Sequence, residues 1–386
     1  MIVFLKGMLP ELDYFIERMA EGLESVYILD ISQDIFYREL GELDAVIDEM
    51  TDVITFDSVG IGVETAEGLN YWELKGVRLY NIFVDAPIYF YHTLERHLKC
   101  MRIIVIDRYH KEFINTYYPG YSVEFLPHGG TRLPDCRIVE YENRPIEVLY
   151  VGTRKYEEQP VIIDVLPDGG KELFNTVEQI LMKYPYMTLE KVFHIYMDET
   201  GIELEPQIQL KVIGALYDIV LTKVRSYYQA KIIETLAAAG IHIEIYYGKG
   251  WRDIAEKYPD YITVHEKILP EECLKLMHNS KITLNIQPWF KYGSHERVYN
   301  AMLNGSVCVT DTSEYLVKHF KNGRDIVFYK LDDLDGLIKN VRMLLDNPGY
   351  AKYIIDNQKK AAESSTWQNR IHNILEQQFE EEKNFI

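Results

Sequence analysis

The sequence lacks the features that mark membrane, secreted and nucleic-acid-binding proteins. No run approaches the roughly 20 apolar residues that a membrane-spanning helix needs. The opening stretch, Met1–Lys6, has neither the basic region nor the long apolar core of a secretory signal. Positive charge is in deficit, because 41 Lys and Arg stand against 60 Asp and Glu, for a formal net charge of −19. A nucleic-acid partner is therefore disfavoured, since its binding requires a basic surface.

Cysteine is scarce and scattered. The chain has four, and none lies within metal-ligand spacing of another: Cys100, Cys136, Cys273 and Cys308. Without a secretory signal, we interpret them as reduced thiols of a cytoplasmic protein. We expect no metal and no cofactor.

Alternating apolar runs and amphipathic stretches fill the first part of the chain. The 386 residues exceed what one hydrophobic core usually supports, so two domains are expected. Residues 1–143 predict a Rossmann-like domain, in which helices such as Leu12–Leu23 and Tyr89–Cys100 separate parallel strands. Its strands are expected at Ile2–Leu5, Val26–Asp30, Val53–Phe56, Val77–Val84, Arg102–Asp107 and Val123–Leu126.

A second alternating region, residues 144–365, starts with the apolar run Ile146–Gly152. Helical periodicity over about 160–238 predicts a helical insertion at about 160–222. Further strands are expected at Ile241–Tyr247, Tyr261–Val264, Ile282–Ile286, Val307–Thr310 and Ile326–Tyr329. The fold class is therefore α/β, with two Rossmann-like domains facing a cleft in which ligands bind beyond the carboxyl ends of strands.

One strand-loop-helix segment has the clearest chemical content. A helix follows the strand Ile282–Ile286, with Ser294 as its expected N-cap and Asn304-Gly305 as its end. Its N-terminal amides and dipole make an anion site.

Residues around this helix start suit a phosphate-bearing ligand. Gly293 lets the backbone approach closely, Arg297 offers a planar fork to phosphate, and Asn300 could reach ribose hydroxyls. His295 and Glu296 flank Arg297. The alternative is a surface helix with a capping serine and an ordinary mixture of charges.

Two other turns should face the same cleft. Gly152 and Arg154 follow the first strand of the second domain, and Gly248 follows a later strand. Both turns can present amides and a cation to phosphates. Trp251 could stack on a base, although packing in the core is the alternative that we favour for it.

In the first domain, Asp85 and His92 follow the strand Val77–Val84 and could serve the acceptor as catalytic groups. The alternative is a turn aspartate and a packed histidine. His128, in the Pro-His-Gly-Gly segment, is a further candidate that a linker turn explains equally well.

The segment from about Lys281 to Arg370 resembles the glycosyltransferase-like C-terminal domain of the CgeB spore-maturation family. The resemblance rests on Lys281–Ile286, His295–Gly305, Val307–Asp311, Glu314–Leu316, Gly323–Tyr329 and the closing Thr366-Trp-x-x-Arg370. Asp85–Pro87, Phe125–Gly129 and Tyr150–Arg154 look like the family's earlier landmarks. The likeness covers most of the chain outside the helical block.

This resemblance implies a GT-B fold, with a nucleotide sugar, such as a UDP-sugar, bound by the C-terminal domain. It also implies that a tail helix, Thr366–Glu382 within residues 366–386, packs near or crosses back to the N-terminal domain. The chain resembles glycosyltransferase family 4 distantly. At the positions of that family's donor-binding Glu-x7-Glu pair, this sequence has Tyr292 and Asn300. We therefore expect Glu296, as a catalytic residue, and Arg297 to do the equivalent work by another geometry.

Three functions follow as hypotheses. The first is sugar transfer from a nucleotide sugar to a protein, glycan or cell-surface acceptor, with helix amides and Arg297 stabilising the diphosphate in place of a metal. The second is a non-catalytic GT-B-shaped protein that binds a nucleotide or glycan in a spore or surface assembly. The third is a sugar epimerase or phosphorylase.

Overall fold

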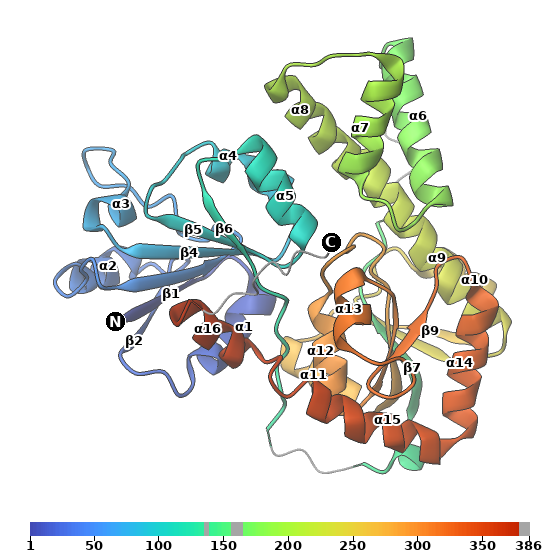
Figure 1. Ribbon diagram of the computed structural model, residues 1–386. Coiled ribbons are helices and arrows are strands. Elements are labelled where there is room, and N and C mark those ends of the chain that lie inside the picture. The colour runs from blue at the N-terminus through green and yellow to red at the C-terminus, as the bar shows by residue number, and fades with distance from the viewer. Residues whose placement is uncertain (135–138, 156–164, 378–386) are drawn as a thin grey trace. The chain divides into compact units, whose positions relative to one another are not determined.

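The computed structural model describes residues 1–134, 139–155 and 165–377 (Figure 1). The chain divides into two compact units: unit 1 is Met1–Gly129 with Ser365–Ile386, and unit 2 is Gly130–Ser364. The chain thus leaves unit 1 at Gly129 rather than at 143. Three sequence expectations fall outside the described residues: Cys136, positions 160–164 of the insertion and positions 378–382 of the tail helix.

Unit 1 holds a six-stranded parallel sheet in the order β2-β1-β3-β4-β5-β6. Each strand lies within a residue or two of its predicted place, which confirms the first Rossmann-like fold. The strands are β1 Ile2–Lys6, β2 Val26–Asp30, β3 Asp52–Phe56, β4 Arg78–Phe83, β5 Met101–Val105 and β6 Ser122–Phe125. The helices are α1 Pro10–Ala20, α2 Phe36–Asp44, α3 Tyr71–Lys75, α4 Tyr91–Leu94, α5 Arg108–Tyr117 and α16 Trp367–Leu375.

One expected helix of unit 1 is much shorter than its pattern predicts. In place of a helix over Tyr89–Cys100, a 3₁₀ turn at Pro87–Phe90 leads into α4, which ends at Leu94. His97 adopts a φ of 50°, a left-handed conformation that a continuing α-helix excludes.

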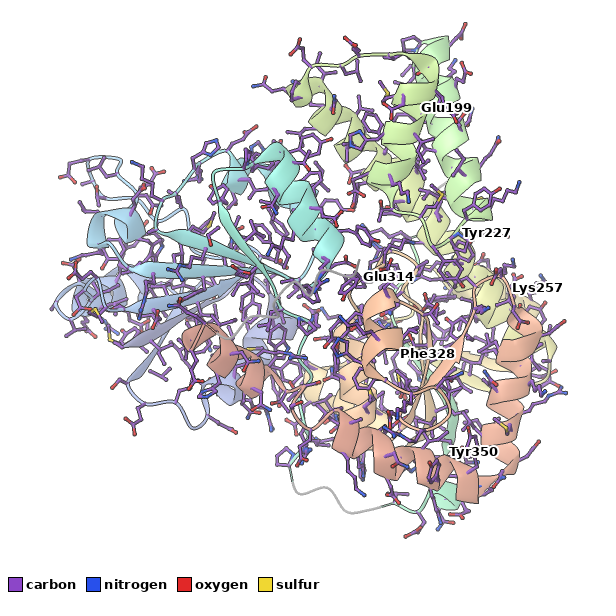
Figure 2. All side chains as sticks on the ribbon, viewed as in Figure 1. Glu199, Tyr227, Lys257, Glu314, Phe328 and Tyr350 are labelled. Atoms are coloured by element: carbon purple, nitrogen blue, oxygen red, sulfur yellow. The ribbon has the colours of Figure 1, made fainter. Side chains whose placement is uncertain are left out.

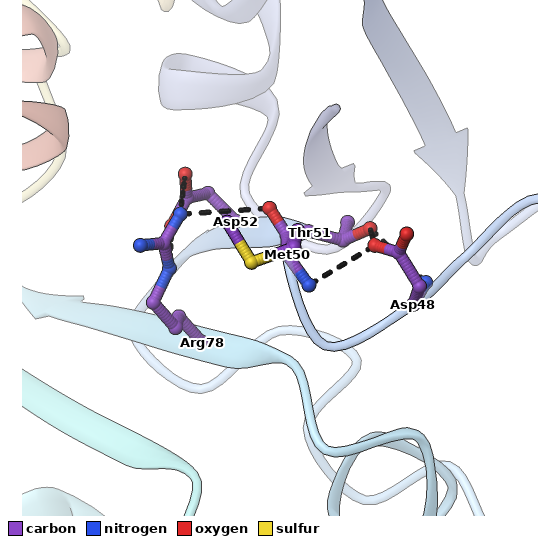
Figure 3. Close-up of polar contacts among 5 residues, drawn as sticks. All are labelled: Asp48, Met50, Thr51, Asp52 and Arg78. Atoms are coloured by element: carbon purple, nitrogen blue, oxygen red, sulfur yellow. Dashed lines mark hydrogen bonds and ion pairs between the residues drawn. The ribbon is translucent and has the colours of Figure 1, made fainter.

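An ion pair joins β3 and β4 at their amino ends, where Asp52 and Arg78 lie opposite each other in the sheet (Figure 3). Nη2 of Arg78 donates to Oδ2 of Asp52 at 2.8 Å, and Nε lies 2.7 Å from Oδ1 in the same ion pair. This two-point geometry is more specific than a single contact. Beside it, Asp48 accepts from the Met50 amide at 3.0 Å and from the Thr51 hydroxyl at 3.1 Å. The opposite, carboxyl edge of the sheet is where Asp57 and Asp85 emerge.

The described tail helix belongs to unit 1, where α16 packs against α1. Trp367 is buried, with its ring centre 5.2 Å from that of Phe56 and 4.8 Å from that of His128. The backbone of Gly129 lies against Trp367, and a Cβ on Gly129 would be 2.8 Å from the Trp367 backbone. Only glycine permits this approach.

Unit 2 holds a second six-stranded parallel sheet in the order β12-β11-β10-β7-β8-β9. All its strands were predicted, which confirms the second Rossmann-like fold. They are β7 Ile146–Val151, β8 Ile243–Tyr246, β9 Ile262–Val264, β10 Ser280–Asn285, β11 Val307–Asp311 and β12 Val327–Tyr329. The helices beyond the insertion are α10 Arg252–Lys257, α11 Pro270–His278, α12 Glu296–Asn304, α13 Glu314–His319, α14 Leu334–Asp346 and α15 Pro348–Ala361.

The helical insertion of unit 2 joins β7 to β8. It comprises α6 Asp168–Lys183, α7 Leu189–Thr200, α8 Pro206–Leu216, a π-helical turn at Tyr217–Leu221 and α9 Thr222–Ala238. Figure 1 shows α6, α7 and α8 grouped beyond the sheet, with α9 running from them onto it. Correspondingly, α9 packs on both α6 and β8. In Figure 2, Glu199 marks the end of α7 and Tyr227 lies on α9.

Among the described helices, none combines the length and the apolarity that crossing a bilayer requires.

Candidate functional site

The residues predicted to bind a ligand at the start of α12 lie at the carboxyl edge of the second sheet, but the N-cap of this helix differs from the prediction. His295, not Ser294, is the N-cap, because its Nδ1 accepts from the Arg297 amide at 3.2 Å. Ser294 is fully buried and donates from its hydroxyl to Tyr299 at 3.0 Å. Since Nδ1 accepts, a neutral His295 ring carries its proton on Nε2.

Helix α12 is also not a surface helix. Every residue from Arg297 to Asn304 is buried. Gly305 ends the helix at a φ of 82°, as its Asn-Gly sequence predicts. The polar side chains within α12 are therefore shielded from solvent and need specific hydrogen-bond partners.

Arg297 carries a buried positive charge at this helix start. It is 8% exposed, and Nη1 donates to Oδ1 of Asn285 at 2.7 Å. Its guanidinium carbon lies 5.4 Å from the ring centre of Tyr150. Within the described residues, no carboxylate forms an ion pair with it. The partner that neutralises this charge is thus absent from the described chain.

A buried amide network holds Arg297 in place. Nδ2 of Asn285 donates to Gln287 and to Thr310, each at 2.9 Å. The Gln287 amide N–H donates to Asp311 at 2.8 Å, and its Oε1 accepts from the His295 amide at 2.8 Å. Burial raises the pKa of Asp311 to about 7, while the Gln287 N–H opposes that rise. Nε2 of Gln287 is buried without a hydrogen-bond partner among the described residues.

Sequence reasoning missed Asn285, Gln287 and Asp311. They are polar residues at the ends of two neighbouring strands, β10 and β11, and that placement is the signal that could have identified them.

The turn after β7 comes directly beside Arg297. A Cβ on Gly152 would lie 3.4 Å from Nη2 of Arg297, so a glycine keeps this space open. Arg154 is buried and donates from Nη2 to Asp253 at 2.8 Å. The structure thus brings Gly152 to the site, and it gives Arg154 an acidic partner within the protein.

The residues around the turn after β8 are structural. Trp251 is fully buried and donates from Nε1 to the carbonyl of Gly152 at 2.9 Å. Base stacking by Trp251 is therefore ruled out in this conformation, and core packing is what the structure shows. At Gly248, a Cβ would lie 2.2 Å from Val264, so close packing with β9 requires the glycine.

Asn300 faces the chain segment that enters unit 2. Its Oδ1 accepts from the Thr131 amide at 2.7 Å, which occupies the oxygen that we expected to reach ribose. Asn304 holds the same segment, accepting from Leu133 at 2.8 Å and donating to Thr131 at 2.8 Å.

The remaining residues of this loop differ in exposure. Tyr292 and Gly293 are buried, whereas Glu296, the first residue of α12, is half-buried. The ring of Tyr292 lies 6.3 Å from that of Tyr315.

In unit 1, Asp85 and His92 are both exposed after β4. The residue that sequence reasoning missed is Asp57, which follows β3 with a φ of 45°. Its Oδ1 accepts from the Val84 amide at 2.9 Å, and burial together with the nearby Asp85 raises its pKa to about 7. His128 is buried, and burial lowers its pKa to about 4, so the linker-turn interpretation fits it better than a cleft role.

No group of three or more His, Cys, Asp or Glu side chains in the described ranges is arranged to hold a metal ion.

Known structures share this architecture. Sucrose-phosphate synthase from Thermosynechococcus elongatus superposes with a TM-score of 0.55 at 11% identity, over 97% of each chain. The DNA-modifying enzyme β-glucosyltransferase, solved with and without its substrate uridine diphosphoglucose, superposes with a TM-score of 0.52 at 14% identity, over 97% of this chain and 100% of its own. At such low sequence identities, the structural similarity establishes the fold alone.

The chain spans 57% of the length of TarM, another structure that it resembles, with a TM-score of 0.46 at 10% identity. No curated protein sequence matches the chain. Residues 225–376 match the family model described as glycosyl transferase-like, a segment that contains α12 and Arg297. The chain thus carries a glycosyl transferase-like segment on the two-domain GT-B fold.

Proposed function

We propose that this protein transfers a sugar from a nucleotide sugar, such as a UDP-sugar, to a protein, glycan or cell-surface acceptor. The donor binds unit 2 at the start of α12. The observation that carries this proposal is Arg297, a buried guanidinium without a carboxylate partner in the described chain.

Energetics favour an anionic ligand at this point. A buried charge is costly unless a counter-charge and hydrogen bonds accompany it. A diphosphate supplies both, and the positive end of the α12 dipole adds to the attraction. The glycosyl transferase-like match of residues 225–376 supports the same ligand class.

The chemical step follows from where charge develops. As the bond between sugar and diphosphate breaks, negative charge grows on the leaving phosphate. Arg297 and the Nε2 proton of His295 stabilise that charge without a metal ion. On the acceptor side we retain Asp85 and His92 as candidates and add Asp57, whose pKa of about 7 suits a general base.

A narrower assignment, to the CgeB-type group, rests on the sequence motifs of residues 281–370. We also propose that the enzyme is cytoplasmic and that it binds its donor without a metal ion.

A turnover assay tests the proposal. Purified protein is incubated with a panel of nucleotide sugars, and free nucleoside diphosphate is measured with and without EDTA. We expect release from at least one donor, insensitive to chelator and greatly reduced in Arg297→Lys. If no nucleotide sugar raises the melting temperature or is turned over, the proposal is wrong.

One observation favours the non-catalytic alternative. The two positions of the family-4 Glu pair hold Tyr292 and Asn300, and the Asn300 oxygen is occupied by a backbone amide. Such a module would be stabilised by a nucleotide sugar, by roughly 2.7 kcal/mol at 100 times the dissociation constant, yet release no product.

A further inference from the structure

The helical insertion is anchored to the candidate site through α9. Gln229, on this helix, donates from Nε2 to the hydroxyl of Tyr150 at 2.9 Å and to the carbonyl of Thr153 at 3.3 Å. Both partners belong to the end of β7 and to the turn that contains Gly152. The position of α9 is therefore fixed relative to the site.

Arg225 lies one turn before Gln229 on α9, and its charge acts on the same Tyr150 hydroxyl. Burial raises the pKa of the Tyr150 hydroxyl, and two nearby guanidinium groups, Arg297 and Arg225, oppose that rise. Two cations from separate helices thus lie near one buried hydroxyl.

The side chain of Arg225 packs on the loop between β10 and α12. Its guanidinium carbon lies 3.9 Å from the ring centre of Trp289. This distance is well within cation–π range. The Trp289 ring lies 6.4 Å from that of His295, the N-cap of α12. The guanidinium of Arg225 therefore packs on the loop that leads into α12, close to the residue that caps this helix.

The other end of the insertion contacts the same loop. Lys291 donates from Nζ to the carbonyls of Pro185, in the α6–α7 connection, and of Pro288. Nearby, the Tyr186 hydroxyl accepts from the Leu331 amide at 3.3 Å. The insertion therefore contacts the loop that leads into α12 at Trp289 and Lys291, and Tyr186 adds a contact to the segment after β12.

A second observation at this helix start indicates a missing acceptor. Nε2 of Gln287 is buried without a partner among the described residues, while its Oε1 accepts from the His295 amide. An unpaired buried donor is destabilising, and a ligand oxygen relieves that cost.

We propose that the helical insertion forms part of the ligand site of unit 2, with Arg225 as a second phosphate-binding cation beside Arg297. This inference rests on the function proposed above and assigns a second cation to the diphosphate of its nucleotide-sugar ligand. Two separate guanidiniums match two linked phosphates, whereas one phosphate engages only one of them fully.

Calorimetric binding to the full-length chain tests this with UDP, pyrophosphate and inorganic phosphate. Arg225→Gln removes the charge and keeps much of the side-chain length, while Arg225→Lys keeps the charge. The control is Lys231→Gln, an exposed cation farther along α9. Arg225→Gln should weaken UDP and pyrophosphate binding about ten- to a hundredfold and phosphate binding less. Arg225→Lys should retain part of the affinity, and the control all of it.

Trp289→Leu provides a second test that leaves every charge in place. Because this variant loses the cation–π contact with Arg225, its UDP binding should weaken by at least about threefold. The role of the insertion is refuted if both Arg225→Gln and Trp289→Leu bind UDP within twofold of wild type while Arg297→Lys shows a clear loss. The proposed function would survive that result. Wild-type protein that binds neither UDP nor pyrophosphate refutes the proposed function as well.

Discussion

Nη1 of Arg297 and Oδ1 of Asn285 form a 2.7 Å hydrogen bond at the carboxyl end of β10. The Asn285 carboxamide is itself oriented by Gln287 and Thr310, so the guanidinium is fixed before any ligand arrives. Such preorganisation is what a phosphate-binding arginine requires, because little reorganisation is then needed during the reaction.

Replacing Arg297 should affect both binding and folding. In Arg297→Ala, loss of a charged hydrogen bond should weaken nucleoside diphosphate binding about ten- to a hundredfold. The unpaired Oδ1 of Asn285 should also lower the stability of unit 2 by about 1–3 kcal/mol, in contrast to the neutral effect expected for a surface arginine. Calorimetry and thermal melting measure the two effects, with the exposed Arg342→Ala as control. Unchanged affinity in a folded variant would move the anion site elsewhere.

The turn between β8 and α10 should not tolerate a side chain. Gly250 has a φ of 86°, and a Cβ there would lie 1.8 Å from the carbonyl oxygen of Arg154. Gly250→Ala should therefore destabilise unit 2 by at least about 2 kcal/mol, measured by thermal melting. Gly169→Ala is the matched control, because a Cβ at this position in α6 meets no atom within 4 Å. It should be neutral or slightly stabilising. Equal melting temperatures in the two variants would contradict the packing argument.

The segment entering unit 2 should depend on Asn304. Its side chain accepts from Leu133, and it donates to the carbonyls of Thr131 and Asn300, each at 2.8 Å. Asn304→Ala leaves several buried polar groups unpaired and should cost roughly 2–4 kcal/mol in denaturant titrations. Asn357→Ala removes a single bond, to Tyr353, on the outer helix α15 and should cost much less. A small effect at Asn304 would show that water replaces its hydrogen bonds.

The stability of unit 1 should fall between pH 4 and pH 7 because of Asp57. Its pKa is about 7 in the folded protein, above the ordinary 3.8, so the folded state holds this proton after the unfolded state has lost it. The stabilisation is complete below pH 4 and is lost as pH rises through 7. Asp57→Asn should therefore lose less melting temperature than wild type between pH 5 and pH 8. The exposed Asp34→Asn should behave as wild type, and an unchanged pH response in Asp57→Asn would contradict the assignment.

The sequence predicted the strands well for a physical reason. Strands that are buried on both faces have short, largely apolar sequences, such as Val53–Phe56 and Val307–Thr310. Few other segments of an α/β protein have this pattern. The α12 segment was also placed correctly, because its Asn-Gly end and the strand before it are local signals.

The hydrogen-bond partners of the polar side chains could not be predicted from the sequence. Whether Ser294 or His295 caps α12 depends on Tyr299, which takes the serine hydroxyl inside the fold. Asn300 was assigned to ribose, yet its partner is Thr131, a residue distant in sequence that only the tertiary fold brings near. The burial of Arg297 was missed for the same reason, since charged residues at a helix start are ordinarily exposed.

The division of unit 1 into two chain segments sets an order of events during synthesis. Residues 1–129 leave the ribosome first, but Phe56 and His128 stay uncovered until Trp367 emerges, after the whole of unit 2. Helix α16, which is made after unit 2, therefore completes a domain whose synthesis started before unit 2. Emergence of α16, rather than of residues 1–129, is the step at which unit 1 acquires its full core.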